Sequence, residues 1–246
     1  MIRIYHTSDL HNNGAIAEKL RALRAAEPGL LVDCGDSLRG SQTVFYRREP
    51  IVAEIDAAGY DLQAMGNREF NYLFGAVEAR VRLMAHPLLC ANLVDTKGRA
   101  LPFSAEKTLH YHDGIRTREV RFFGLLVPQY PVGSIWEKIF GWRFLDPFVV
   151  AEEIAASTPE DVTLVALSHI GLRADRELAR RVPRIDLLLG GHSHDTLPQP
   201  EYVGEVPIVH AGPYGRFVSR TELTLTAERA RITRFDLVPL LEPVRA

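Results

Sequence analysis

Short apolar runs alternate with amphipathic segments through the first third of the chain. The apolar runs are rich in β-branched and aromatic residues, as strands are, and apolar residues between them recur at helical spacing. Pro28-Gly29 and Gly59 stand where two of the helices would end. The pattern predicts strands over 2–7, 30–33, 61–65 and 88–91, and helices around 16–23, 51–58 and 72–84.

The rest of the chain changes character. Segments 108–112 and 117–126 flank Asp113-Gly114, which predicts a hairpin turn. Segments 162–167 and 185–189 are almost wholly apolar, as in strands buried on both faces. Further elements are expected as helices over 148–156 and 174–181 and strands over 207–210, 216–226 and 230–238. We therefore expect one α/β domain over residues 1–246, with two mixed sheets between helical layers.

Charge and composition exclude several functions. The 246 residues include 29 Lys and Arg against 31 Asp and Glu, a net charge of −2, which makes nucleic acid an improbable main partner. Without a run of about 18 apolar residues, we expect no membrane span. The first residues lack the layout of a secretion signal, which favours a cytoplasmic protein. With two cysteines no disulfide framework is indicated, and the sequence does not reveal the oligomeric state.

Five polar clusters each follow a predicted buried strand. In open α/β sheets, ligands bind at the edge formed by the carboxyl ends of the strands. We therefore expect the five clusters to form one site. They are Asp9-Leu10-His11-Asn12-Asn13, Gly35-Asp36-Ser37, Gly66-Asn67-Arg68-Glu69, Ser168-His169 and Gly190-Gly191-His192-Ser193-His194-Asp195.

The residue types in these clusters indicate metal binding. Asp, Asn and His together suit Mn, Fe, Zn, Co or Ni better than Ca or Mg. In extended backbone, the two ligands of Asp9-x-His11 and of His192-x-His194 would point to the same side. Each cluster alone also fits an ordinary turn, and His169 alone fits a core histidine. Their joint occurrence at five strand ends predicts a metal site.

These motifs resemble the calcineurin-like metallophosphoesterase superfamily, and within it the catalytic domain of the 5'-nucleotidase branch. Asp9-Leu10-His11 is similar to D-x-H, and the segment from Gly35 to Ser41 to G-D-x-x-x-G-S. Four further blocks continue the likeness toward the end of the chain. They are Gly66-Asn67-Arg68-Glu69-Phe70, Leu167-Ser168-His169-Ile170-Gly171 with Gly191-His192-Ser193-His194, and Ala211-Gly212-Pro213-Tyr214-Gly215-Arg216-Phe217-Val218. The resemblance implies a four-layer α-β-β-α sandwich.

The resemblance also implies a dinuclear centre. It places Asp9, His11 and His194 on one metal, and Asn67, His169 and His192 on the other, with Asp36 bridging the two. Two divalent transition-metal ions are implied, with Mn favoured. In this scheme a metal-bound hydroxide hydrolyses a small phosphate ester, either a monoester or a diester.

The chain departs from the family pattern at a catalytic position. Arg68 replaces the family's histidine, and Asn71 stands where the branch has the aspartate that partners it. Arginine grips phosphate oxygens well, but a guanidinium does not give up a proton to the leaving group. Weak action on alkyl esters is therefore expected. The same departure motivates an alternative function, a metal-binding regulator or sensor with little catalysis.

Two residues are weaker candidates for contact with substrate. Arg39 could reach an anion or simply lie in solvent, and His210 could supply the missing proton or have no role. The chain ends soon after its last predicted strand, where nucleotidases of the branch continue into a base-binding domain. A nucleotide substrate is therefore not implied.

Overall fold

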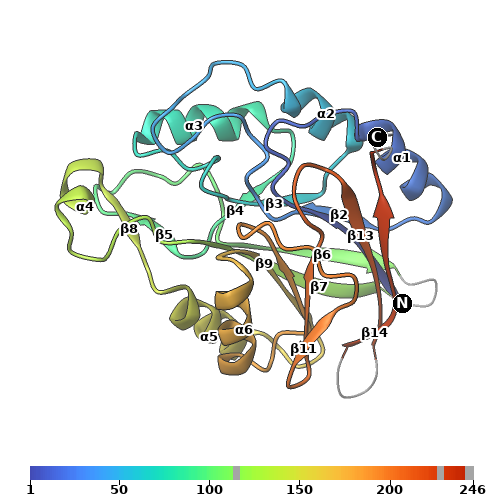
Figure 1. The fold of residues 1–246 in the computed structure, drawn as a ribbon. Helices are drawn as coiled ribbons and strands as arrows, with labels where there is room; N and C mark the ends of the chain where they lie inside the picture. Colours follow the sequence, from blue (N-terminus) through green and yellow to red (C-terminus); the bar gives the residue numbers. More distant parts are fainter. Residues whose placement is uncertain (113–116, 226–229, 242–246) are drawn as a thin grey trace.

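Two six-stranded mixed sheets pack face to face between helices in the computed structural model, which describes residues 1–112, 117–225 and 230–241 (Figure 1). This arrangement confirms the predicted four-layer α-β-β-α sandwich. The predicted turn at Asp113-Gly114 lies outside the described residues.

The first sheet carries the amino-terminal strands. Strands β1, β2, β3 and β4 run parallel to one another. Strand β13 pairs antiparallel with β1, and β14 pairs antiparallel with β13. Thr7 pairs with Asp33, so β1 and β2 end at the same level. The spatial order is β14 (Ala230–Pro239), β13 (Phe217–Leu225), β1 (Ile2–Thr7), β2 (Leu30–Asp33), β3 (Leu62–Ala64) and β4 (Leu88–Leu89).

The second sheet has a parallel centre and antiparallel edges. Strands β12, β10, β9 and β7 run parallel, and β11 and β6 close the two edges. The order is β11 (Glu201–Val203), β12 (Val206–His210), β10 (Leu187–Gly190), β9 (Thr163–His169), β7 (Thr117–Leu126) and β6 (Glu106–His112). A separate ribbon pairs β5 (Leu93–Asp95) with β8 (Trp142–Phe144).

Helices cover the outer faces of both sheets (Figure 1). Helices α1 (Ala17–Ala26), α2 (Ile51–Ala58) and α3 (Phe74–Leu83) pack on the first sheet, and α5 (Pro147–Ser157) and α6 (Leu172–Arg181) on the second. Helix α4 (Ile135–Phe140) lies beside the β5–β8 ribbon. Local sequence sets the ends: Asp146 caps the start of α5 through the Phe148 amide at 2.8 Å, and Gly59 closes α2 at a φ of 73°.

Side chains from the facing sheets form a core of their own. Ile4 and Val32 of the first sheet belong to one buried cluster with Phe122, Val165 and Leu189 of the second. Neighbouring strand residues point the other way: Tyr5 and Leu31 pack against the helices above the first sheet. This alternation fixes the two sheets together and brings their carboxyl ends to one edge of the sandwich.

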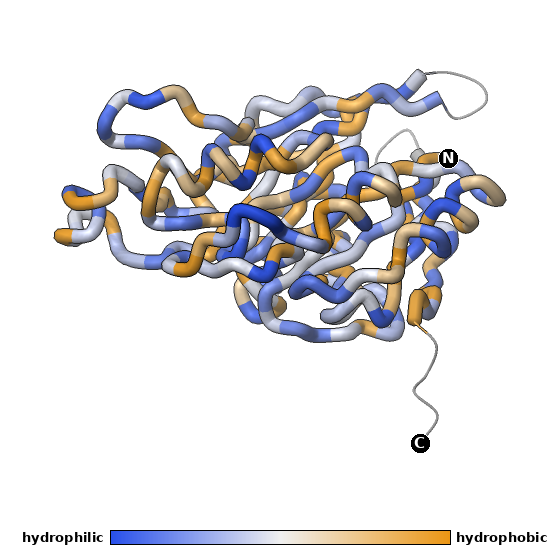
Figure 2. Tube along the Cα trace, turned by 90° about the horizontal axis from the view of Figure 1, so that it is seen from above, coloured by the Kyte–Doolittle hydropathy of each residue, from blue (hydrophilic) through white to orange (hydrophobic). Residues whose placement is uncertain are grey.

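No helix in the described part of the chain is long and apolar enough to cross a membrane. Along the trace, apolar segments are short and interrupted by polar ones (Figure 2).

Candidate metal centre

The predicted clusters converge where five strands of the two sheets end. Asp9, Asp36 and Asn67 follow β1, β2 and β3 of the first sheet. His169 is the last residue of β9 in the second sheet, and the His192 to His194 loop follows β10. The carbonyl of Cys34, just after β2, accepts a 2.6 Å hydrogen bond from His169 Nδ1, so the two sheets meet directly at the site.

One group of donors consists of Asp9, His11 and His194. The Nε2 atoms of the two histidines lie 2.8 Å apart. Asp9 Oδ1 lies 3.8 Å from His11 Nε2 and 3.6 Å from His194 Nε2. Three donors of this kind converging on one point form a group that could hold a metal ion.

A second group lies beside the first. Asp36 Oδ1 is 3.3 Å from His169 Nε2, and Asp9 also falls within this group. The amide oxygen of Asn67 lies 3.2 Å from His169 Nε2 and 3.1 Å from His192 Nδ1. The structure therefore brings all seven predicted ligands together, with Asp9 next to both groups.

The backbone reaches this arrangement through left-handed residues rather than extended ones. Asp9 and His11 have φ angles of 53° and 49°, and His192 and His194 have 75° and 60°. The prediction that extended backbone aligns each ligand pair is therefore wrong. Left-handed φ is unfavourable for residues with a Cβ, so the surroundings must hold it. The amides of Asp9 and His11 donate 2.9 Å hydrogen bonds to the carbonyls of Gly35 and Asp36, and the His192 amide donates to the Asp9 carboxylate at 3.0 Å.

Electrostatics favour a cation at the site. Asp9 and Asp36 are buried close together. Burial raises the pKa of Asp9, and the Asp36 carboxylate raises it further. Burial also lowers the pKa values of His11 and His192 to about 4, which leaves both rings neutral at pH 7. Neutral imidazoles and ionised carboxylates are the forms that bind metals. At His169 the Asp36 carboxylate outweighs burial and raises the pKa to about 10, so a bound cation would displace a proton from this ring.

Arg68 stands at the edge of this cluster. Its amide donates a 2.7 Å hydrogen bond to Asp36 Oδ1, and its Nε lies 3.9 Å from Asp36 Oδ2. The side chain is 35% exposed, so part of the guanidinium faces solvent. Asn71 is occupied elsewhere, since its amide donates to the Ser41 carbonyl at 3.1 Å and accepts from the Leu73 amide at 2.9 Å.

The two weaker candidates lie in different places. Arg39 is exposed near Arg68, with its guanidinium 3.8 Å from the centre of the Tyr46 ring. His210 does not reach the cluster surface, because its side chain is 1% exposed and its Nε2 lies 2.7 Å from Asp175 Oδ2. Burial in β12 thus separates His210 from any molecule above the candidate ligands.

Sequence reasoning assigned no role to Glu69, although its motif was recognised. This side chain is fully buried and accepts hydrogen bonds from four backbone amides, those of Asp36, Ser37, Leu38 and Gly66, at 2.7–3.2 Å. It thereby shapes the loop that presents Asp36. The acidic side chain three residues after Gly66 was the available signal, but the role of Glu69 depends on contacts across 33 residues of sequence.

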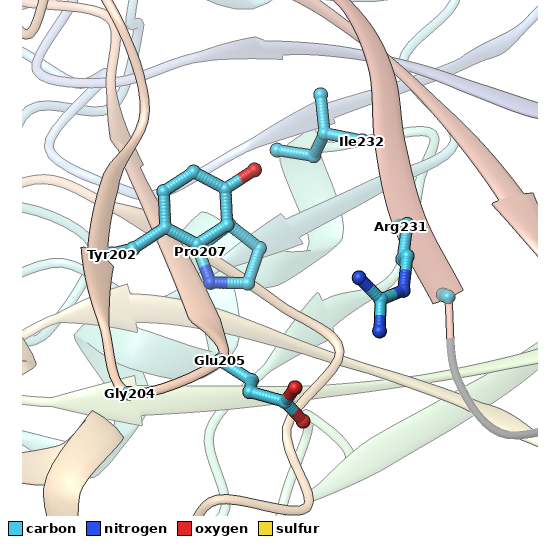
Figure 3. A pocket seen from close by; sticks show the side chains of 7 residues that line it. Tyr202, Gly204, Glu205, Pro207, Arg231 and Ile232 are labelled. Atoms are coloured by element: carbon cyan, nitrogen blue, oxygen red, sulfur yellow. The ribbon is translucent and has the colours of Figure 1, made fainter.

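A separate hollow lies away from this cluster. It is lined by residues that include Tyr202, Glu205, Pro207 and Arg231 (Figure 3). Glu205 and Pro207 flank the first residue of β12, whereas the candidate ligands His192 and His194 follow the end of the parallel strand β10. The hollow is therefore not part of the candidate metal centre.

The fold and the donor cluster both agree with the family that the sequence matches. The chain belongs to the calcineurin-like phosphoesterase family, whose model matches residues 2–196. Divalent metal ions are implied by this family, and the candidate ligand groups are present here.

Sequence similarity to known relatives extends over most of the chain. The uncharacterised metallophosphoesterase YunD of Bacillus subtilis is 29% identical over 94% of this chain and 52% of its own length. Human 5'-nucleotidase is 29% identical over 87% of this chain and 41% of its own length. Among solved structures, a 5'-nucleotidase precursor from Thermus thermophilus matches with a TM-score of 0.77 at 21% identity, covering 97% of this chain and 54% of that one. The chain thus spans about half the length, or less, of these relatives.

Proposed function

We propose that the chain hydrolyses small phosphate esters with two divalent cations held between the two sheets. The observation that carries the proposal is the convergence of two donor groups, Asp9, His11 and His194 beside Asp36, His169 and Asn67, at one edge of the sandwich. This edge is where α/β sheets bind ligands. Phosphate-ester hydrolysis is also the chemistry of the family to which the chain belongs.

The residues present fit a pair of transition-metal ions. Nitrogen donors from four histidines and oxygen donors from Asp9, Asp36 and Asn67 suit Mn, Fe, Zn, Co or Ni, and we favour Mn. In the proposal, Asp9, His11 and His194 hold one ion, Asn67, His169 and His192 the other, and Asp36 bridges them. When bound, the ions would lower the pKa of a water molecule and neutralise charge on the phosphoryl group.

Arg68 is proposed to bind the phosphoryl oxygens in place of the family's histidine. Its guanidinium lies against Asp36 and is partly exposed, so it can meet an anion above the cluster. A planar guanidinium grips two phosphoryl oxygens at once and stabilises the charge that develops in the transition state. It cannot protonate the leaving oxygen, so the proposal includes a preference for esters with good leaving groups.

The substrate class follows from the relatives only in part. Two relatives have nucleotides in their names, human 5'-nucleotidase and the trifunctional nucleotide phosphoesterase YfkN of Bacillus subtilis. This chain covers only 41% and 17% of their lengths. We therefore propose aryl phosphate monoesters and diesters first, with nucleoside monophosphates as the next class to test.

A hydrolysis panel tests the proposal. Chelator-treated protein is supplied with Mn²⁺ and assayed on an aryl phosphate, a bis-aryl phosphate, nucleoside monophosphates and single-stranded DNA. Metal-dependent release of phosphate or phenol supports the phosphoesterase. Mn²⁺ binding without turnover on any ester would instead support the metal-binding regulator, which the replacements at Arg68 and Asn71 motivate.

A further inference from the structure

A buried polar cluster lies beneath the proposed metal centre, formed by Ser168, Asp175 and His210. Ser168 Oγ donates a 2.5 Å hydrogen bond to one carboxylate oxygen of Asp175, and His210 Nε2 lies 2.7 Å from the other. All three side chains are at most 1% exposed. The cluster joins the ends of strands β9 and β12 to helix α6.

The cluster lies next to the two strand ends that carry proposed ligands. Ser168 directly precedes His169, and its carbonyl accepts a 2.9 Å hydrogen bond from Gly191, which directly precedes His192. Gly190 pairs with Ser168 on one side and with His210 on the other. A Cβ at Gly190 would overlap His210 Nε2 and Asp175 Oδ2, so the cluster packs directly against β10.

Helix α6 also contacts the loop that carries His192 and His194. The amide of Leu172, at the start of α6, donates a 3.0 Å hydrogen bond to Ser193 Oγ, between the two histidines of the loop. Asp175 lies one turn further along this helix. A shift of α6 would therefore move both the strand ends below the centre and the loop above it.

Burial of the Asp175 carboxylate is unfavourable, because taking an ionised group out of water costs several kcal/mol unless it is well paired. Among the described residues, Asp175 has no Lys or Arg partner, and its pairing rests on Ser168 and His210. Apolar residues would fill the same space at lower cost. Polar networks of this kind fix one geometry of the groups that they join.

We propose that Asp175 is a positioning residue for the metal centre. Through Ser168 it fixes the backbone that carries His169, and through His210 and Gly190 it fixes the strand that leads to His192. This inference rests on the proposed function, since it assigns these histidines to a cation. Residues that support ligands from behind typically change metal affinity or activity by 10–100-fold when replaced.

The test measures the binding of Mn²⁺ by the chelator-treated protein, with Asp175→Asn compared against Asp186→Asn. Asp186 is a matched control because it is 4% exposed and also bonds β9, but at the opposite end, through the Leu164 amide at 2.9 Å. We expect Asp175→Asn to weaken Mn²⁺ binding by about 10-fold and to shift the visible absorption of the Co²⁺-loaded protein. Asp186→Asn should lower the melting temperature without either effect.

Ser168→Ala serves as the milder variant if Asp175→Asn does not fold, and it should weaken Mn²⁺ binding in the same direction. Equal Mn²⁺ affinity and an unchanged Co²⁺ spectrum in the variant that folds would overturn the positioning role. So would equal losses in Asp175→Asn and Asp186→Asn, which would show a general stability effect. A wild-type protein that binds no Mn²⁺ would overturn the proposed function as well, which distinguishes the two failures.

Discussion

The Nε2 atoms of His11 and His194 lie 2.8 Å apart, although 183 residues separate the two histidines in the chain. Their rings also contact Tyr214, with ring centres 5.5 Å from each, so both are held from the side. Two ring nitrogens facing one point, with Asp9 behind them, resemble a ligand set more than a structural contact. This relationship leads to the first prediction.

His194→Ala should weaken cation binding much more than folding. The His194 side chain is 39% exposed, so its removal from the metal-free protein should change the free energy of unfolding by about 0.5 kcal/mol or less. Stabilisation of the wild type by Mn²⁺ follows its affinity for the folded state, so the rise in melting temperature with Mn²⁺ should shrink in the variant. An unchanged Mn²⁺-induced rise would argue against His194 as a ligand.

Arg68→His should improve the hydrolysis of alkyl esters selectively. A histidine can donate a proton to a poor leaving group, and such general acid help is worth about 10²–10⁴-fold. The ratio of kcat/KM on an alkyl phosphate to that on an aryl phosphate should therefore rise. Arg82→His, at a 73% exposed arginine of α3, serves as the control and should leave the ratio unchanged. The leaving-group argument fails if the ratio does not rise in Arg68→His.

Glu69→Gln should destabilise the fold around Asp36. Each carboxylate oxygen of Glu69 accepts two backbone amides, and an amide nitrogen in place of one oxygen would leave two buried donors unpaired. We expect a loss on the order of 3 kcal/mol in the free energy of unfolding, measured by urea denaturation. Glu78→Gln, on the exposed face of α3, should change it by about 0.5 kcal/mol at most. Equal effects of the two substitutions would contradict the role of Glu69.

His86 should contribute a pH dependence to folding. Burial lowers its pKa from 6.5 to about 4, and its Nε2 donates to Gln63 Oε1 at 2.9 Å. Between pH 6.5 and pH 4 the unfolded chain binds a proton here that the folded chain does not, so stability falls as the pH falls through this window. With chelator present, the wild type should lose on the order of 3 kcal/mol more than His86→Gln between pH 7 and pH 4. Parallel pH profiles for the two proteins would contradict it.

The layers of the fold were predictable because their signals are local. Buried strands such as β9 read as continuous apolar runs, and Gly59 ended α2 where the pattern stopped. Strands β5, β8 and β11 and helix α4 were not predicted. They have three to six residues, which is too few for a hydrophobic periodicity to be recognised in the sequence. These short elements are stabilised by tertiary contacts, such as the Tyr130 hydroxyl on the Trp142 carbonyl at 2.8 Å.

The ligand cluster was predictable in its membership but not in its geometry. Residue type and position at strand ends identified Asp36, His169 and the others. The left-handed φ of His11 and His192 was not predictable, because neither residue type requires it and the surrounding backbone imposes it. For the same reason, burial of His210 against Asp175 could not be read from a histidine at the end of a strand.

The rate of aryl phosphate hydrolysis in metal-stripped protein, measured against added Mn²⁺ in the wild type and in Asp36→Asn, tests the central proposal most directly. Activity in the wild type should rise from near zero and level off at two Mn²⁺ per chain. Asp36→Asn should show little activity at any Mn²⁺ concentration, because the proposed bridging carboxylate is gone, while Asp161→Asn, at an exposed position, should match the wild type. Full activity without metal, or undiminished activity in Asp36→Asn, would contradict a two-metal phosphoesterase bridged by Asp36.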